Sequence, residues 1–197
     1  MVKGEKFMSE VIVITSGKGG VGKTTTAINL SACLAEKGKR VLTIDMDPQG
    51  NTTSGLGIDK STVEHTSYQL LTNETTIWEA MTPSIVPGLS VIASERSLAG
   101  AEIELIGVED REFILKKEVD KVRDNYDFVI IDCPPSLNTL TVNAMTTADT
   151  VLVPIQCEYY ALEGLSELIY TIELVKERLN NKSVSYTHLR AHETCAD

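Results

Sequence analysis

Apolar residues along the chain alternate between short uninterrupted runs and longer segments with helical spacing. The short runs, rich in β-branched residues, predict buried strands near Val11, Val41, Val91, Val129 and Val151. Helical spacing predicts helices over residues 24–37, 98–106, 111–123, 138–147 and 161–180, with only short helices over 52–87. Because strands alternate with helices, the pattern predicts an α/β fold, a doubly wound, mostly parallel sheet with helices on both faces.

A glycine-rich loop follows the first predicted strand. It matches the phosphate-loop spacing G-x-x-x-x-G-K-[ST] at Gly17, Gly22, Lys23 and Thr24. In such a loop, backbone N–H groups point inward and bind phosphate oxygens, and the following helix adds its positive N-terminal dipole. The spacing assigns Lys23 to the β- and γ-phosphates and the Thr24 hydroxyl to Mg²⁺. The loop therefore predicts binding of a nucleoside triphosphate.

Two further strands end in carboxylates. Asp45 and Asp47 come at the end of the strand near Val41, and Asp132 ends the strand near Val129. In open α/β sheets ligands bind at the carboxyl ends of the strands, so we expect Asp45 and Asp47 to face the bound phosphates. Four apolar residues followed by Asp132 have the form of a Walker B strand, which would hold Mg²⁺ directly or through water. The alternative for Asp132 is a turn residue that ends a strand before proline.

Lys18 is a second lysine inside the phosphate loop. An ordinary phosphate loop needs no cation at this position, so Lys18 indicates a catalytic or switching task. The alternative is a solvated loop lysine.

With the segments 47–51, 131–136 and 154–164, the loop resembles the ParA/Soj branch of the deviant Walker A ATPases, which are chromosome and plasmid partition proteins. The resemblance runs from about residue 11 to residue 181. Thr15 and Ser16 stand where partition proteins usually carry Asn-Gln, so the related MinD-like branch stays an alternative.

The resemblance implies a role for each matching residue. Lys18 would reach across a dimer interface to the partner's nucleotide, and Asp47 would orient or activate the attacking water, so Lys18 and Asp47 are the expected catalytic residues. Thr24, Asp47 and Asp132 would form the magnesium site, the carboxylates in part through water. The expected nucleotide-binding residues are Lys18, Gly19, Gly20, Val21, Gly22, Lys23, Thr24 and Thr25.

The resemblance also implies a function. It predicts slow hydrolysis of ATP with Mg²⁺, a homodimer in the ATP-bound state, a ParB-like activator, and non-specific DNA binding through a C-terminal part that this chain lacks. The full-length form would be cytoplasmic and associated with the nucleoid. Two alternatives stay open: a MinD-like membrane-cycling ATPase for division-site placement, and an inactive truncated nucleotide-binding fragment.

Composition agrees with one domain outside a membrane. The chain has 197 residues, 42% of them hydrophobic, which is enough for one core. Its apolar runs are too short to span a bilayer, so we expect no membrane association. The excess of 28 acidic over 18 basic residues argues against a surface that is basic throughout. The four scattered cysteines favour reduced thiols, and Cys133 is expected to pack in the core rather than to bind a cluster.

The end of the chain differs in pattern from the rest. Residues 184–194 have neither strand nor helix periodicity and resemble a transposon-type sequencing adapter translated in frame. The alternative is a divergent polar tail. We therefore expect a flexible N-terminus at 1–10, an incomplete phosphate-loop ATPase domain at 11–182 that lacks its C-terminal strands, and a non-native tail at 183–197.

Overall fold

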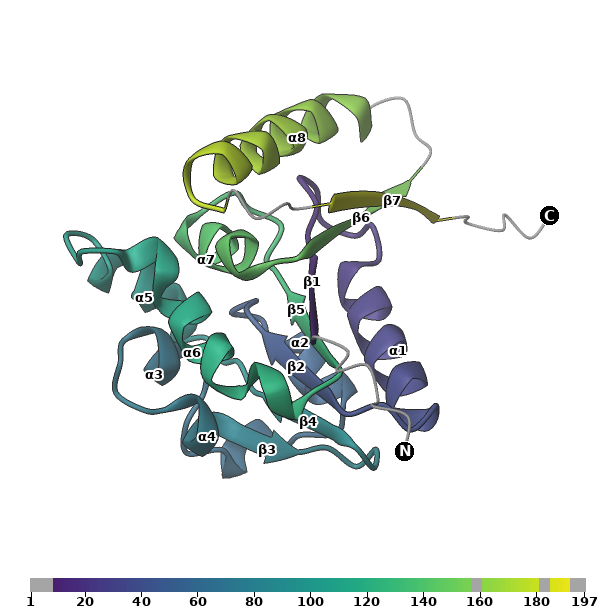
Figure 1. Ribbon diagram of the computed structural model, residues 1–197, viewed down its shortest axis with the longest axis vertical. Coiled ribbons are helices and arrows are strands. Elements are labelled where there is room, and N and C mark those ends of the chain that lie inside the picture. The colour runs from purple at the N-terminus through teal and green to yellow at the C-terminus, as the bar shows by residue number, and fades with distance from the viewer. Residues whose placement is uncertain (1–8, 157–160, 181–184, 192–197) are drawn as a thin grey trace, which may run out of the picture.

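One sheet organises the chain. The computed structural model describes residues 9–156, 161–180 and 185–191 (Figure 1). Its strands are β1 (Glu10–Ile14), β2 (Val41–Asp45), β3 (Met81–Pro83), β4 (Leu89–Ile92), β5 (Phe128–Asp132), β6 (Thr150–Gln156) and β7 (Ser185–Ala191). They lie in the order β3-β4-β2-β5-β1-β6-β7, and every pair is parallel except β3 with β4. The expected α/β class and mostly parallel sheet are confirmed.

Helices cover both faces of the sheet. They are α1 (Lys23–Glu36), α2 (Asn51–Gly55), α3 (Ser67–Leu71), α4 (Ile77–Ala80), α5 (Leu98–Glu104), α6 (Ile114–Val122), α7 (Thr139–Thr147) and α8 (Ala161–Arg178), with 3₁₀ turns η1 (Lys60–Thr62), η2 (Arg111–Phe113) and η3 (Arg123–Asn125). Figure 1 shows α1 on one side of the strands and α6 and α7 on the other. The helix expected over 111–123 is thus α6 with a 3₁₀ turn at each end.

The alternation of side chains along the strands builds two cores. In β1, Val11 and Val13 join the core under α3–α8, whereas Ile14 joins the core under α1. In β5, Val129 and Ile131 face the first core and Ile130 faces the second. Because both faces are covered, these strands are apolar throughout rather than alternating with polar residues.

Strand register brings the functional segments to one edge of the sheet. Ile14 pairs with Asp132, and Asp45 also pairs with Asp132, so the last residues of β1, β2 and β5 lie level with one another. The loop after β1 therefore begins beside both carboxylates. This is the edge at which ligands bind in parallel sheets.

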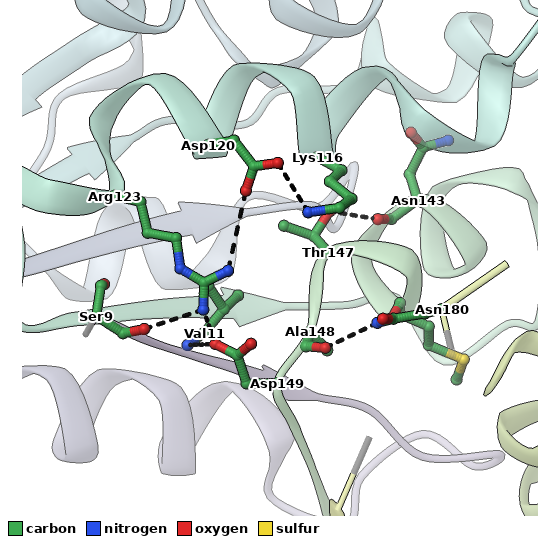
Figure 2. A network of polar contacts seen from close by, with 11 residues as sticks. Ser9, Val11, Lys116, Asp120, Arg123, Asn143, Thr147, Ala148, Asp149 and Asn180 are labelled. Atoms are coloured by element: carbon green, nitrogen blue, oxygen red, sulfur yellow. Dashed lines mark hydrogen bonds and ion pairs between the residues drawn. The ribbon is translucent and has the colours of Figure 1, made fainter. Parts of the chain in front are cut away.

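A polar network lies at the other edge of the sheet, where β1 and β6 begin (Figure 2). The Arg123 guanidinium donates to the Asp149 carboxylate and, at 3.0 Å, to the Ser9 carbonyl. The same carboxylate accepts from the Val11 N–H at 2.9 Å, and the Asp149 N–H donates back to the Val11 carbonyl. Hydrogen bonds from Arg123 therefore connect the end of α6 to the start of β1 and to the segment before β6.

Two strands were not expected. β3 is a three-residue antiparallel edge strand inside the segment predicted to carry only short helices. β7 lies within residues 184–194, where we expected no strand, and pairs in parallel with β6. Without β7, this edge of β6 would have unpaired backbone groups, and pairing to such an edge depends little on side-chain pattern. The identity of residues 183–197 as a non-native tail stays a prediction. Of the N-terminus expected to be flexible at 1–10, residues 1–8 lie outside the described chain, and Glu10 begins β1.

Other expectations concern packing. Leu70, Leu71 and Ile77 are fully buried, so the apolar stripes of α3 and α4 pack on the sheet as expected.

Cys133 is buried among core residues, whereas Cys33 is exposed. In the part of the chain that the structure describes, no helix is long and apolar enough to cross a membrane.

Candidate functional site

The phosphate loop joins β1 to α1 and exposes its glycine-rich part to solvent. Gly20 and Gly22 have φ values of +78° and +89°, a conformation that residues with a Cβ rarely adopt. A Cβ at Gly19, Gly20 or Gly22 would meet no atom within 4 Å, so the space beside the loop is open. Open space next to backbone N–H groups at a helix N-terminus fits an incoming phosphate.

Lys23 is the first residue of α1 and is only 7% exposed. Its Nζ donates to the Lys18 carbonyl at 3.4 Å, and the Ser16 hydroxyl donates to the same carbonyl at 2.7 Å. Burial lowers the pKa of Lys23, whereas the nearby Asp132 and Asp47 oppose that shift. A buried cation held between the loop and two carboxylates is arranged to receive an anion.

The other expected nucleotide-binding residues lie in or directly after the same loop. Lys18, Gly19, Gly20 and Thr25 are exposed, whereas Val21 is buried with its side chain in the protein. A contact from Val21 to phosphate could therefore use its backbone N–H, as the expected cradle requires.

Asp132 is nearly inaccessible, with 1% of its surface exposed. Its Oδ2 accepts hydrogen bonds from Thr24 Oγ1 at 3.0 Å and from Thr52 Oγ1 at 2.6 Å. Its Oδ1 is buried and has no hydrogen-bond partner among the described residues. Burial raises the pKa of Asp132 to about 6, and the bonds from Thr52 and Thr24 and the charge of Lys23 limit the rise.

A magnesium ion fits this arrangement. An uncompensated carboxylate oxygen beside a threonine hydroxyl supplies the hard oxygen ligands that Mg²⁺ prefers. The described residues contain no group of three or more acidic, histidine or cysteine side chains placed to hold a metal on their own. Mg²⁺ usually binds through one or two protein groups together with substrate phosphates, so Thr24 and Asp132 suit a nucleotide-bound ion.

Asp45 departs from the expectation that it faces the phosphates. It is fully buried, and its Oδ2 accepts from the Thr53 N–H at 2.8 Å and the Thr53 hydroxyl at 2.7 Å. Its Oδ1 accepts from the Asp47 N–H at 3.1 Å. Burial raises the pKa of Asp45 to about 7, against the hydrogen bonds from Thr53. Asp45 therefore binds the start of α2, and we correct its expected role.

Asp47 begins the turn that leads into α2 and is half-buried. Its Oδ1 accepts from the Gln49 N–H at 2.9 Å, and its carbonyl accepts from the Gly50 N–H at 2.8 Å. Its charge opposes the lowering of the Lys23 pKa and contributes to the raised pKa of Asp132. Asp47 thus belongs to the same charged cluster as Lys23 and Asp132.

Sequence reasoning missed three hydroxyl residues, Thr52, Thr53 and Ser94. Thr52 binds Asp132, Thr53 binds Asp45, and the Ser94 hydroxyl donates to the Asp47 carbonyl at 2.7 Å. Two consecutive threonines after the Asp-Pro-Gln-Gly-Asn segment were the available signal for the first two. No sequence signal identified Ser94, because only folding brings the end of β4 beside the end of β2.

Comparison with known proteins agrees with this geometry. The AAA domain family AAA_31 matches residues 9–185. The chain is 54% identical over 173 residues to the sporulation initiation inhibitor protein Soj of Bacillus subtilis, covering 88% of this chain and 68% of Soj. It is 51% identical over 178 residues to the chromosome partitioning protein ParA of Myxococcus xanthus, covering 90% of this chain and 63% of that relative.

Solved structures share the fold. A cobyrinic acid a,c-diamide synthase from Mycobacterium smegmatis, with bound ATP analogue and magnesium, superposes with a TM-score of 0.88 at 37% identity, covering 92% of this chain and 74% of the synthase. A plasmid partition protein from Borrelia burgdorferi superposes with a TM-score of 0.81 at 28% identity, covering 96% of this chain and 81% of that protein. With the phosphate loop, the two carboxylate-bearing strands and these relatives together, the chain belongs to the AAA_31 domain family and, within it, to the ParA/Soj family of chromosome-partitioning ATPases.

Proposed function

We propose that this chain is the nucleotide-binding part of a partition ATPase that binds ATP with Mg²⁺ and hydrolyses it slowly. The observation that carries the proposal is Asp132, whose Oδ2 is bound by Thr24 and Thr52 while its buried Oδ1 has no hydrogen-bond partner among the described residues. Such an oxygen, beside the phosphate loop and the Lys23 cation, is the expected ligand of a nucleotide-bound magnesium ion.

Different residues would bind the phosphates and the magnesium ion. The loop N–H groups and Lys23 would hold the phosphate oxygens, because both present positive charge at the start of α1. Thr24 and Asp132 would hold Mg²⁺, which neutralises charge on the transferred phosphoryl group. The charge of Lys23 supports the ionised state of Asp132 that such a role needs.

Two residues would act in hydrolysis. Asp47 would orient the attacking water, since it lies in the charged cluster and is half-buried rather than sealed in the core. Lys18, exposed at the loop, would reach the phosphates bound by a second copy of the chain. A cation supplied across an interface in this way accelerates phosphoryl transfer by about 10³–10⁵-fold in related mechanisms.

The proposal includes the biological setting of the family. The ATP-bound dimer would bind DNA non-specifically, respond to a ParB-like activator, and serve chromosome or plasmid partition in the cytoplasm on the nucleoid. The relatives are named sporulation initiation inhibitor protein Soj and chromosome partitioning protein ParA. The net charge of −10 implies that DNA binding would use a local basic patch rather than the whole surface.

The test is ATP turnover by the full-length gene product, measured as phosphate release with and without DNA. We expect slow turnover that DNA and an activator increase and that chelation of Mg²⁺ abolishes. Lys23→Ala should remove turnover, whereas Lys39→Ala, beyond the far end of α1, should leave it unchanged. Absence of magnesium-dependent turnover with DNA and activator present would contradict the proposal, and ATP-dependent sedimentation with lipid vesicles would favour the MinD-like alternative.

A further inference from the structure

The backbone of Asp47 lies in a closed ring of hydrogen bonds. The ring consists of Asp45, Asp47, Thr53 and Ser94, and we call it the Asp47 ring. The Asp47 N–H donates to Asp45 Oδ1 at 3.1 Å, and the Ser94 hydroxyl donates to the Asp47 carbonyl at 2.7 Å. Thr53 Oγ1 closes the ring because it donates to Asp45 Oδ2 at 2.7 Å and accepts from the Ser94 N–H at 2.9 Å.

The ring forms hydrogen bonds with both backbone polar groups of Asp47. With the N–H and the carbonyl of Asp47 each held by a side chain, φ and ψ of this residue have little freedom. The next residue, Pro48, restricts Asp47 further, because a residue before proline avoids helical backbone angles. The direction of the Asp47 Cα–Cβ bond is therefore set by its neighbours, and the Gln49 N–H, which donates to Asp47 Oδ1 at 2.9 Å, restrains the side chain as well.

Three members of the ring are buried, which favours a fixed geometry. Asp45, Thr53 and Ser94 have no exposed surface. They come from three places: the end of β2, the start of α2 and the segment after β4. Hydrogen bonds in a buried network reinforce one another, and a missing member leaves a buried polar group unpaired.

Gly50 shows how closely the ring is enclosed. Its φ is +61°, and a Cβ at this position would lie 2.4 Å from the Ser94 carbonyl oxygen. Only glycine allows the turn after Asp47 to approach the ring at this distance. The turn and the ring are thus packed against each other.

We propose that Thr53 and Ser94, together with Asp45, are positioning residues that hold Asp47 at the geometry needed for hydrolysis. This inference rests on the proposed function of Asp47. Asp45, Thr53 and Ser94 differ from the phosphate-binding residues, since none belongs to the loop and their side-chain hydrogen bonds lead to one another and to Asp47. Loss of a ring hydroxyl should therefore affect turnover more than nucleotide binding.

The experiment compares Thr53→Val, Thr53→Ser and Ser94→Ala in the full-length gene product. Thr53→Val and Ser94→Ala should lower kcat by about tenfold or more, the size of effect expected when a supporting partner of a functional group is removed. The dissociation constant for ATP should stay within about threefold of the wild-type value. Thr53→Ser retains the hydroxyl and should restore most of kcat. Ser54→Ala, an exposed position of the same helix, is the matched control.

Two further measurements distinguish a positioning role from a general loss of folding stability. Amide hydrogen exchange at Asp47, Gln49 and Gly50 should become faster in Ser94→Ala by about tenfold, while exchange in β5 should not change. In an Asp47→Asn background, Ser94→Ala should cause no further loss of turnover, because the group that it positions is already removed.

The outcomes distinguish the two proposals. Wild-type turnover combined with normal kcat and normal exchange in Ser94→Ala and Thr53→Val would overturn the positioning role alone. No turnover by the wild type would overturn the proposed function, and the exchange measurement would still decide whether the ring holds Asp47. If Thr53→Val fails to unfold cooperatively, Ser94→Ala against Ser54→Ala supplies the comparison: faster exchange at Asp47 and lower kcat in Ser94→Ala alone support the positioning role, and normal values in both contradict it. Slow turnover in Thr53→Ser would contradict the hydroxyl of Thr53 as the group that matters.

Discussion

Asp45 and Asp132 are register partners on the adjacent strands β2 and β5, and consecutive threonines of α2 bind the two carboxylates. Asp45 accepts three hydrogen bonds that occupy both of its oxygens. Asp132 accepts two on one oxygen and leaves the other without a hydrogen-bond partner among the described residues. Two carboxylates at the same level of one sheet therefore differ in capacity: Asp45 stabilises α2, whereas Asp132 can take a metal ion.

The two loop lysines should separate binding from dimerisation. Lys23→Ala should weaken ATP binding by more than about tenfold, because a buried charge-assisted contact is worth about 1.5–3 kcal/mol. Lys18→Ala should bind ATP nearly as the wild type does but lose ATP-dependent dimerisation. Isothermal titration calorimetry and light scattering would measure the two properties. An equal loss of ATP binding in both variants would contradict this division.

Asp47→Ala should trap an ATP-bound dimer. Without the carboxylate that orients water, turnover should fall by about 10²-fold or more, since positioned acid or base groups contribute about 10²–10⁴ to rate. Nucleotide binding should persist because Lys23 and the loop are intact. Size-exclusion chromatography with ATP, followed by analysis of the bound nucleotide, checks the result. Bound ADP after long incubation would argue against the role of Asp47.

The metal-free protein should lose stability as the pH rises from about 4 to about 7. Burial raises the pKa of Asp45 from 3.8 to about 7 and that of Asp132 from 3.8 to about 6, so in this range the folded state binds more protons than the unfolded state. The free energy of unfolding then falls as pH increases, by up to about 1.4 kcal/mol per unit of pKa difference.

Asp45→Asn should weaken this pH dependence and leave the part that Asp132 contributes, whereas Glu64→Gln, at an exposed position, should leave it as in the wild type. Urea unfolding at several pH values with EDTA present would measure it. A parallel pH profile in Asp45→Asn and wild type would show that Asp45 does not carry the effect.

The Arg123 network predicts a purely structural effect. Arg123→Met should destabilise the fold by about 1–3 kcal/mol, because the Arg123 side chain, only 20% exposed, is the donor to the partly exposed Asp149 carboxylate and to the Ser9 carbonyl (Figure 2). ATP binding by the folded fraction should not change, since the network lies at the other ends of the strands.

Arg40→Met is the control for that measurement. Arg40 forms an exposed ion pair with Asp127, and exposed pairs contribute little to stability. Chemical denaturation should therefore show a smaller change for Arg40→Met than for Arg123→Met. The reverse order would contradict the structural importance of the network.

The sequence by itself determined the α/β class and the phosphate site. Uninterrupted β-branched runs identify strands buried on both faces, and the glycine spacing before Lys23 and Thr24 is a local signal that needs no tertiary contact. The Walker B form of β5 likewise depends only on neighbouring residues. The helices that flank these strands followed from their own periodicity.

Tertiary structure decided what each carboxylate can do. Asp45 and Asp47 are two residues apart and equal in sequence pattern, but only packing against α2 buries Asp45 and gives Thr53 as its donor. The role of Ser94 depends on the pairing of β4 with β2, which joins residues almost fifty positions apart. The edge strand β7 is a similar case, because its pairing uses the open backbone groups of β6 rather than an apolar pattern of its own. Local spacing predicts the phosphate-binding site, whereas long-range hydrogen bonds determine which side chains are held and which stay available.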